Sequence, residues 1–276
     1  MESLLADVDR RARLENGRNL VIAAFVAAAL YLSGTQAELD PARLVAKAPQ
    51  MLRFLNGFVH PNFDVVRLGN SFPEGLVEHF AIETITIAVL GTFIGSAIAV
   101  PISFMAARNL MRRNLLGTVL YFLTRTVMSI VRAVPTLFWG LIFVSVVSVG
   151  PFAGVLAVTI FSFGLMSKLF SEAIEAIDWG QVEALTATGA NPVQVVVHAV
   201  LPQVTPYLVA NLLYTFEVNI HSATILGLIG AGGLGFLFQQ YAETQDYDSQ
   251  AMLLYVVIVM TTLIDNTSAA IRRRII

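Results

Sequence analysis

Long apolar runs, separated by more polar segments, are the feature that most restricts how this chain can fold. The runs cover residues 20–32, 82–107, 115–149, 152–170, 204–228 and 251–264. A helix needs about 20 apolar residues to cross the hydrocarbon core of a bilayer. Since 56% of the 276 residues are hydrophobic and only 13% are charged, against about 25% in soluble domains, the runs predict an all-α, polytopic membrane protein.

Several kinds of functional site are excluded by residues that the sequence lacks. It has no cysteine, which rules out a disulfide framework, a thiolate metal site and a cysteine nucleophile. With only four histidines, a multi-histidine metal site is not expected. The net charge of -2 gives no support to the concentrated basic patch that nucleic-acid binding needs. No G-x-x-x-x-G-K-[ST] segment occurs, so we expect no ATP hydrolysis by this chain and no cofactor or metal within it.

The placement of arginine predicts the topology. The run at 115–149 is long enough for two spans, but Arg125 and Arg132 in its first half would each cost about 2.5 kcal/mol or more at the bilayer centre. We therefore place that half at the interface and expect one crossing. The resulting six spans keep the arginine-rich segments inside and the acidic loop 229–250 outside, as the positive-inside rule requires. Both termini are predicted to be cytoplasmic.

The predicted spans divide the chain into four parts. Residues 1–19 are a polar cytoplasmic tail, 20–34 an uncleaved first transmembrane helix, 35–81 an external segment and 82–276 the membrane core. Within the external segment, residues 41–59 carry apolar side chains at helical spacing, with Arg43, Lys47 and Arg53 between them. This pattern fits an amphipathic helix on the outer surface of the membrane. An ordinary connector packed on the bundle is the alternative.

The predicted cytoplasmic loop at residues 171–203 has the sequence of two short helices joined by a sharp corner. Gly189 suits the left-handed position that ends a helix. Asn191 can cap the next helix, with Pro192 at its first position, where the missing N–H costs nothing. Pro202 is predicted to mark a further boundary.

The same loop resembles the coupling-loop signature of permease subunits in binding-protein-dependent ABC importers. That signature is Glu-Ala-Ala, three residues, Gly, nine residues, then Ile-x-Leu-Pro. Glu183-Ala184, Gly189 and Leu201-Pro202 match it, while Leu185 and Ala199 replace the second Ala and the Ile. The resemblance implies a short helix that docks in a groove of an ATPase subunit, with Glu183, Ala184 and Gly189 at its centre. A generic helical hairpin is the alternative.

Further stretches resemble the phosphonate permeases within that family. They are VRAVPTLFWGLIFV at 131–144, KLFSEAIEAI at 168–177, FEVNIHSATILGLIGAGGLG at 216–235 and the arginine-rich end, and the resemblance covers residues 82–274. It implies a type I importer fold in a bacterial inner membrane and a homodimer of this chain around one pathway. It also implies two partner ATPase subunits that bind ATP and Mg, and an extracytoplasmic substrate-binding protein.

Phosphonate or a related phosphorus oxyanion, such as phosphate or phosphite, is the cargo that the resemblance implies. His221 stands where this branch is expected to have an arginine. A permease of the same fold for another solute, such as methionine, and an ion-coupled secondary carrier are the alternatives.

Glu217 and His221 are the candidate residues of the translocation pathway. They lie four residues apart on one face of the fifth span, and ionisable groups within spans usually face a bundle interior or an aqueous path. A structural pair at i,i+4 is the alternative. Because a lone carboxylate repels an oxyanion, we expect His221 or an arginine beside Glu217. Arg125 and Arg132 could add positive charge at the inner mouth or extend to the interface.

Two glycine patterns are interpreted as structural. The segment GAGGLG at 230–235 fits G-x-G-x-x-G, but a dinucleotide site needs a preceding strand. We predict a tight turn with positive φ angles near the outer mouth, with a plain loop as the alternative. Gly91 and Gly95 are predicted to allow two helices to pack closely.

Overall fold

A computed structural model of the protein describes residues 2–37, 40–67, 76–112 and 114–275, and its regular elements there are all helical. The chain divides into two compact units, residues 1–53 and 54–276. In the first unit, α1 (Glu2–Gln36) runs without a break through the predicted tail and the predicted first span. Its part from Arg18 to Gln36 is long and apolar enough to cross a membrane.

The predicted amphipathic helix is present as α2 (Pro41–Val59). Its bounds coincide with the predicted residues 41–59, so the helical spacing of the apolar side chains is confirmed as a helix. The position of α2 on the outer surface stays a prediction.

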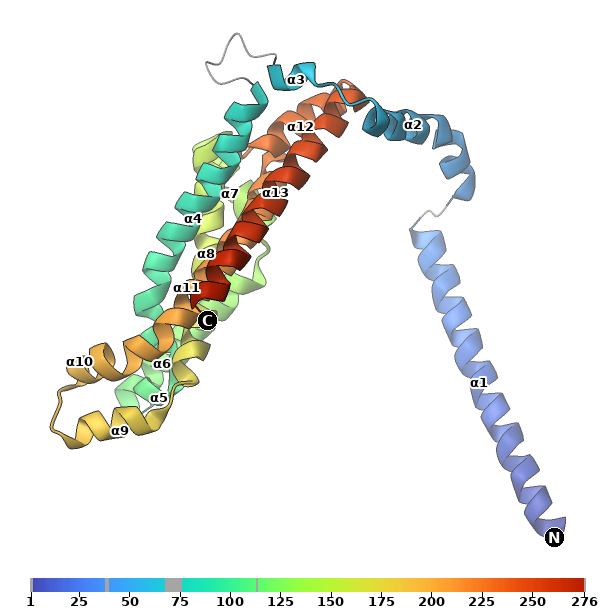
Figure 1. Ribbon diagram of the computed structural model, residues 1–276. Coiled ribbons are helices and arrows are strands. Elements are labelled where there is room, and N and C mark those ends of the chain that lie inside the picture. Colours follow the sequence, from blue (N-terminus) through green and yellow to red (C-terminus); the bar gives the residue numbers. More distant parts are fainter. Residues whose placement is uncertain (1, 38–39, 68–75, 113, 276) are drawn as a thin grey trace. The chain divides into compact units, whose positions relative to one another are not determined.

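The second unit is a bundle in which four long helices run side by side (Figure 1). They are α4 (Leu76–Ala106), α8 (Pro151–Glu175), α11 (Leu201–Gly227) and α13 (Tyr247–Ile275). With α1 and α6 (Leu115–Ala133), they give six described helices that are long and apolar enough to span a membrane. The number of predicted spans is therefore confirmed.

Small residues bring α4 and α8 into close contact. A Cβ atom added to Gly91 would lie 2.7 Å from the Val158 Cβ, and one added to Gly95 would lie 2.7 Å from the Thr159 carbonyl oxygen. Since larger side chains would force these backbones apart, the predicted packing role of the two glycines is confirmed.

A buried polar cluster fixes the register of three helices. The Asn219 amide on α11 donates to the Thr92 hydroxyl on α4 at 2.6 Å and to the Ser162 hydroxyl on α8 at 2.7 Å. All three side chains are buried. Hydrogen bonds between membrane helices each contribute about 0.6 kcal/mol on average, and their geometry permits one alignment of α4, α8 and α11.

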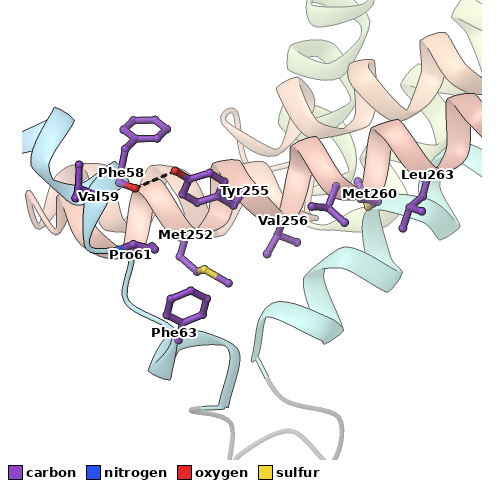
Figure 2. Close-up of a pocket in the computed structure, with 10 residues that line it drawn as sticks. Phe58, Val59, Pro61, Phe63, Met252, Tyr255, Val256, Met260 and Leu263 are labelled. Atoms are coloured by element: carbon purple, nitrogen blue, oxygen red, sulfur yellow. Dashed lines mark hydrogen bonds between the residues drawn. The ribbon is translucent and has the colours of Figure 1, made fainter.

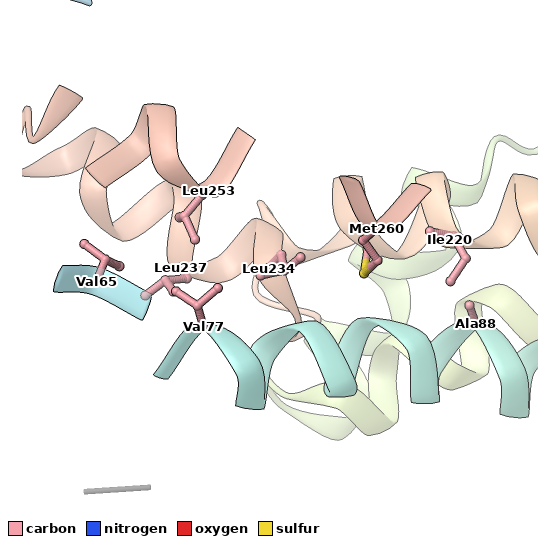
Figure 3. Packing of buried hydrophobic residues seen from close by; sticks show 8 residues of the cluster. All are labelled: Val65, Val77, Ala88, Ile220, Leu234, Leu237, Leu253 and Met260. Atoms are coloured by element: carbon pink, nitrogen blue, oxygen red, sulfur yellow. The ribbon is translucent and has the colours of Figure 1, made fainter. Parts of the chain in front are cut away.

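An apolar cluster closes the end of the bundle where α4 and α13 begin (Figure 3). Short helices α3 (Asp64–Arg67) and α12 (Leu234–Glu243) pack there against α4, α11 and α13. The buried members are Val65, Val77, Ala88, Ile220, Leu234, Leu237, Leu253 and Met260. This cluster holds the turn between α11 and α12 against the start of α4.

The run at 115–149 crosses the bundle once, as two helices. Arg125 on α6 bonds to Glu175 at the last residue of α8, whereas Gly150, after α7 (Thr136–Val147), precedes the first residue of α8. The predicted single crossing is therefore confirmed. However, a 12-residue α7 rises only about 18 Å, less than the about 30 Å of a bilayer core. The expectation that the first half lies only at the interface was wrong, because α6 must supply part of the crossing.

An apolar groove of ≈840 Å³ separates α13 from the last turn of α2 and the chain segment that follows it (Figure 2). Phe58, Pro61 and Phe63 line one side, and residues of α13 line the other. The Tyr255 hydroxyl donates to the Phe58 carbonyl at 2.9 Å, which ties the last turn of α2 to α13.

Candidate coupling loop and transport pathway

The corner of the loop is built as the sequence predicts. The helix α9 (Trp179–Ala187) ends before Gly189, whose φ is +84° and whose N–H donates to the Thr186 carbonyl at 3.0 Å. Asn191 and Gln194 then cap α10 (Pro192–Val195) reciprocally, each side chain accepting from the other residue's N–H at 2.9 Å. The roles predicted for Gly189, Asn191 and Pro192 in this turn are confirmed.

The boundary predicted at Pro202 is not a break in the helix. The chain stays helical from Pro192 to Gly227, passing through a π-helical turn at η1 (Val196–Val200) before α11. The Leu201 N–H bonds to the Val196 carbonyl, five residues back. The wider turn accommodates Pro202, which has no N–H to donate, and α11 continues without interruption.

A small core and one glutamine hold the base of the loop. The core consists of Ala107, Ile174, Val182, Val195, Ala199, Val200 and Val204. Gln203 accepts from the Asp178 N–H at 2.8 Å and donates to the carbonyls of Asp178 and Ala199 at 3.3 and 2.7 Å. The role of Gln203 was not predicted. The one sequence feature that could have indicated it is the position of Gln203 directly after the Leu201-Pro202 end of the signature.

The outward surface of the loop carries the residues predicted to contact an ATPase. Val182 anchors α9 with 2% exposure, while Glu183, Ala184 and Gly189 are exposed. Among the described residues, none but the two chain neighbours of Gly189 could have an atom within 4 Å of a Cβ added there. Leu201 and Pro202 are exposed as well. The α9–α10 hairpin lies at the opposite end of the bundle from α12 (Figure 1), so this surface is open to a partner.

Glu217 has an arginine partner, but not one that the sequence singled out. Its carboxylate lies 2.7 Å from the Arg272 guanidinium of α13, with side-chain exposures of 14% and 30%. In the sequence, Arg272 is only a topology signal within the C-terminal arginine triplet. The bond joins residues 55 positions apart, a separation that no local pattern reveals.

His221 belongs to a different surface from the Glu217 carboxylate. It is exposed on α11, in line with Tyr207 and Tyr214, which are 57% and 46% exposed. The three positions repeat every seven residues, two helical turns, and so share one face. The structure therefore pairs Glu217 with α13 and leaves His221 on the open face of α11.

Comparisons with known proteins place this arrangement in a family. Residues 99–276 match the family described as "Binding-protein-dependent transport system inner membrane component". The chain belongs to this family. It is therefore a membrane component of an importer and not an enzyme.

Two relatives of the permease come from Stutzerimonas stutzeri. The phosphite transport system permease protein PtxC is 38% identical over 192 residues, covering 70% of this chain and 68% of that protein. The putative phosphite transport system permease protein HtxC is 31% identical over 277 aligned positions, covering 98% and 92%. The second alignment covers almost the whole chain, the loop and the long helices included.

A solved structure shows the fold of the permease. An inward-facing form of the MetNI methionine ABC transporter superposes with a TM-score of 0.64 at 23% identity, covering 73% of this chain and 96% of that one. The predicted type I importer fold is confirmed.

Arg125 is tied into the loop-bearing end of the permease bundle. Its guanidinium lies 2.7 Å from the Glu175 carboxylate, donates to the Ala106 carbonyl at 3.2 Å and stands 5.1 Å from the centre of the Tyr121 ring. Arg125 thus joins α6 to the ends of α4 and α8, a structural role that the sequence did not predict. Arg132 is exposed, and its interfacial role stays a prediction.

The glycine segment forms the tight turn that was predicted. Gly230, Gly232 and Gly233 have φ angles of 88°, 83° and 76°. The Glu83 carboxylate, which sequence reasoning missed, accepts from the Gly233 N–H at 2.8 Å, and so ties the turn to α4. Beyond it on α12, burial raises the pKa of the Tyr241 phenol, and the nearby Asp246 carboxylate adds to that rise, so the phenol stays protonated at neutral pH.

Proposed function

We propose that this permease moves a phosphorus oxyanion inward, with phosphite, phosphate and phosphonate as the candidates. The observation that carries the proposal is the pair of phosphite permeases at 38% and 31% identity. The methionine transporter with the same fold is only 23% identical. An extracytoplasmic substrate-binding protein would select and deliver the cargo.

Two partner ATPase subunits would drive the cycle, since the sequence has no P-loop of its own. Glu183, Ala184 and Gly189 would dock in their grooves, and ATP and Mg would bind only to those subunits. The exposure of this surface and the rigid support from Gln203 favour such a contact. A rigid loop can transmit the movement of the ATPase directly to α8 and α11.

The pathway would run between two copies of this chain. Tyr207, Tyr214 and His221 are exposed on a helix of membrane-spanning length, and polar groups within spans normally face protein or water. A homodimer would cover this face and frame an aqueous path. The Arg272 guanidinium balances the negative charge of the Glu217 carboxylate. An oxyanion that passes His221 would therefore not be repelled by an unpaired carboxylate nearby.

We place the permease in a bacterial inner membrane with both termini in the cytoplasm. The coupling loop and the arginine groups at 108–113 and 272–274 would face inward, following the positive-inside rule. The turn at 230–235 and α12 would face the substrate-binding protein.

The cargo is tested by the ATPase activity of the reconstituted complex. The permease is purified with its co-expressed ATPase and substrate-binding protein and placed in liposomes. We expect ATP hydrolysis to rise when the binding protein is loaded with phosphite, phosphate or a phosphonate, because only a loaded receptor completes the cycle. Loading with methionine should leave the basal rate unchanged. Stimulation by methionine alone would contradict the proposed cargo and leave the family assignment intact.

A further inference from the structure

A polar pocket of ≈590 Å³ lies at the loop-bearing end of the bundle, where α4 gives way to α5 (Arg108–Met111). Arg108, Asn109, Arg112 and Glu175 line it. None of these four residues belongs to the proposed coupling contact at Glu183, Ala184 and Gly189. The pocket therefore needs an explanation of its own.

The charges around this pocket do not balance. Its one lining carboxylate, Glu175, is bound by the Arg125 guanidinium at 2.7 Å and by the Arg108 backbone N–H at 2.7 Å. Within the described part of the chain, no ion pair joins a carboxylate to the guanidinium of Arg108 or Arg112. Two positive charges therefore remain at the pocket, which favours an anion as its occupant.

Arg112 is held in place by aromatic rings. Its guanidinium carbon lies 5.9 Å from the centre of the Tyr121 ring and 5.7 Å from that of Phe122. Such contacts restrict the side chain without using its N–H donors. Two guanidinium groups with free donors match the oxygens of a phosphate group.

An apolar surface begins next to the pocket. Exposed side chains of α6 form a stripe that consists of Leu115, Leu116, Val119, Phe122 and Leu123, which are 55% to 83% exposed. Phe122 belongs both to this stripe and to the contact with Arg112. A ligand that fits both surfaces has a phosphate at one end and hydrocarbon at the other.

We propose that this pocket binds the phosphate of an anionic phospholipid, with Arg108 and Arg112 on its oxygens and the acyl chains along the stripe on α6. The lipid would belong to the inner leaflet of the membrane, an assignment that rests on the proposed topology. Because Glu175 ends α8, just before the coupling loop, a bound lipid would stabilise the bundle end from which that loop extends. A free phosphorus oxyanion has the same headgroup chemistry and is the other source to distinguish.

The test is lipid retention by the complete permease–ATPase complex in detergent, measured by native mass spectrometry. The probes are phosphatidylglycerol, zwitterionic phosphatidylcholine and inorganic phosphate. The variant Arg108→Gln/Arg112→Gln is compared with Arg273→Gln, which removes an exposed arginine from α13. Each arginine near an anionic surface contributes about a fivefold gain in affinity. We expect the double variant to bind phosphatidylglycerol about 25-fold more weakly, and Arg273→Gln to bind it like the parent.

Each outcome decides the proposal. Selective retention of phosphatidylglycerol, lost in the double variant, supports a lipid site. Saturable binding of inorganic phosphate with no lipid preference, lost in the same variant, overturns the lipid and supports a free oxyanion. Equal retention of phosphatidylglycerol by the parent and the double variant overturns the site. Since binding in detergent depends on neither the cargo nor the orientation, its failure is distinguishable from failure of the proposed function.

Discussion

Replacing Gly189 with arginine is expected to abolish ATP-driven transport while the permease still folds and inserts. Apart from the two neighbouring residues, no described residue has an atom within 4 Å of a Cβ at this position, so we expect the added side chain to meet its main obstacle in a docked partner. A mismatch in the centre of an interface costs several kcal/mol, and about 4 kcal/mol weakens association roughly a thousandfold. The measurement is copurification of the ATPase subunit, together with uptake into liposomes.

Two matched controls separate docking from folding. Gly189→Ala introduces the same backbone strain at a positive φ, about 1–2 kcal/mol, but no large side chain. Most of the permease should therefore still copurify with the ATPase subunit.

Glu183→Arg reverses a charge at the predicted centre of the contact and should weaken binding of the ATPase subunit. Gln181→Arg adds a charge on another face of the exposed helix α9 and should leave that binding unchanged. Normal assembly and uptake by both Gly189→Arg and Glu183→Arg would show that this surface does not dock.

Replacing Glu217 with glutamine should lower the thermal stability of the permease by about 1–3 kcal/mol. The change leaves the Arg272 cation without its carboxylate at a site where the two side chains are only 30% and 14% exposed. Breaking a fully buried pair costs about 3–5 kcal/mol and breaking an exposed pair about 0.2–1 kcal/mol. The measurement is the unfolding temperature of the purified permease, and the double variant Glu217→Gln/Arg272→Gln should recover part of the loss.

His221→Gln is the matched comparison, because His221 lies four residues away on the open face of α11. It should leave the unfolding temperature near that of the parent. If His221 contacts the oxyanion, loss of a hydrogen bond to a charged group should reduce transport per assembled complex by about tenfold or more. Parent-like transport by His221→Gln would show that His221 does not line the pathway. Parent-like stability of Glu217→Gln would contradict the structural role of its pair with Arg272.

The fold could be predicted largely because its signals are local. Apolar runs near bilayer length predicted the spans, and the chemistry of Gly189, Asn191 and Pro192 predicted the corner between α9 and α10. Each of these features depends on residues within a few positions of one another. The error at Pro202 has the same origin, since a π-helical turn that accommodates a proline leaves no distinct mark in the sequence.

The contacts that stabilise the site could not be predicted. Arg272 reaches Glu217 across 55 positions, and Glu83 reaches Gly233 across 150. A charged residue near the end of a span has the same appearance in the sequence whether it extends to the interface or pairs within the bundle, as Arg125 does with Glu175. Only the packing of the helices distinguishes these roles, so the partners of charged residues emerged with the structure.

The orientation of the coupling loop is the central claim, and labelling of single cysteines in intact cells tests it most directly. The native chain has no cysteine, so an introduced cysteine is the only thiol in each variant. Gln181 in the loop and Glu243 at the end of α12 are both exposed and are replaced one at a time. An impermeant thiol reagent should label Glu243→Cys and spare Gln181→Cys until the cells are opened. Labelling of Gln181→Cys from outside would contradict the account.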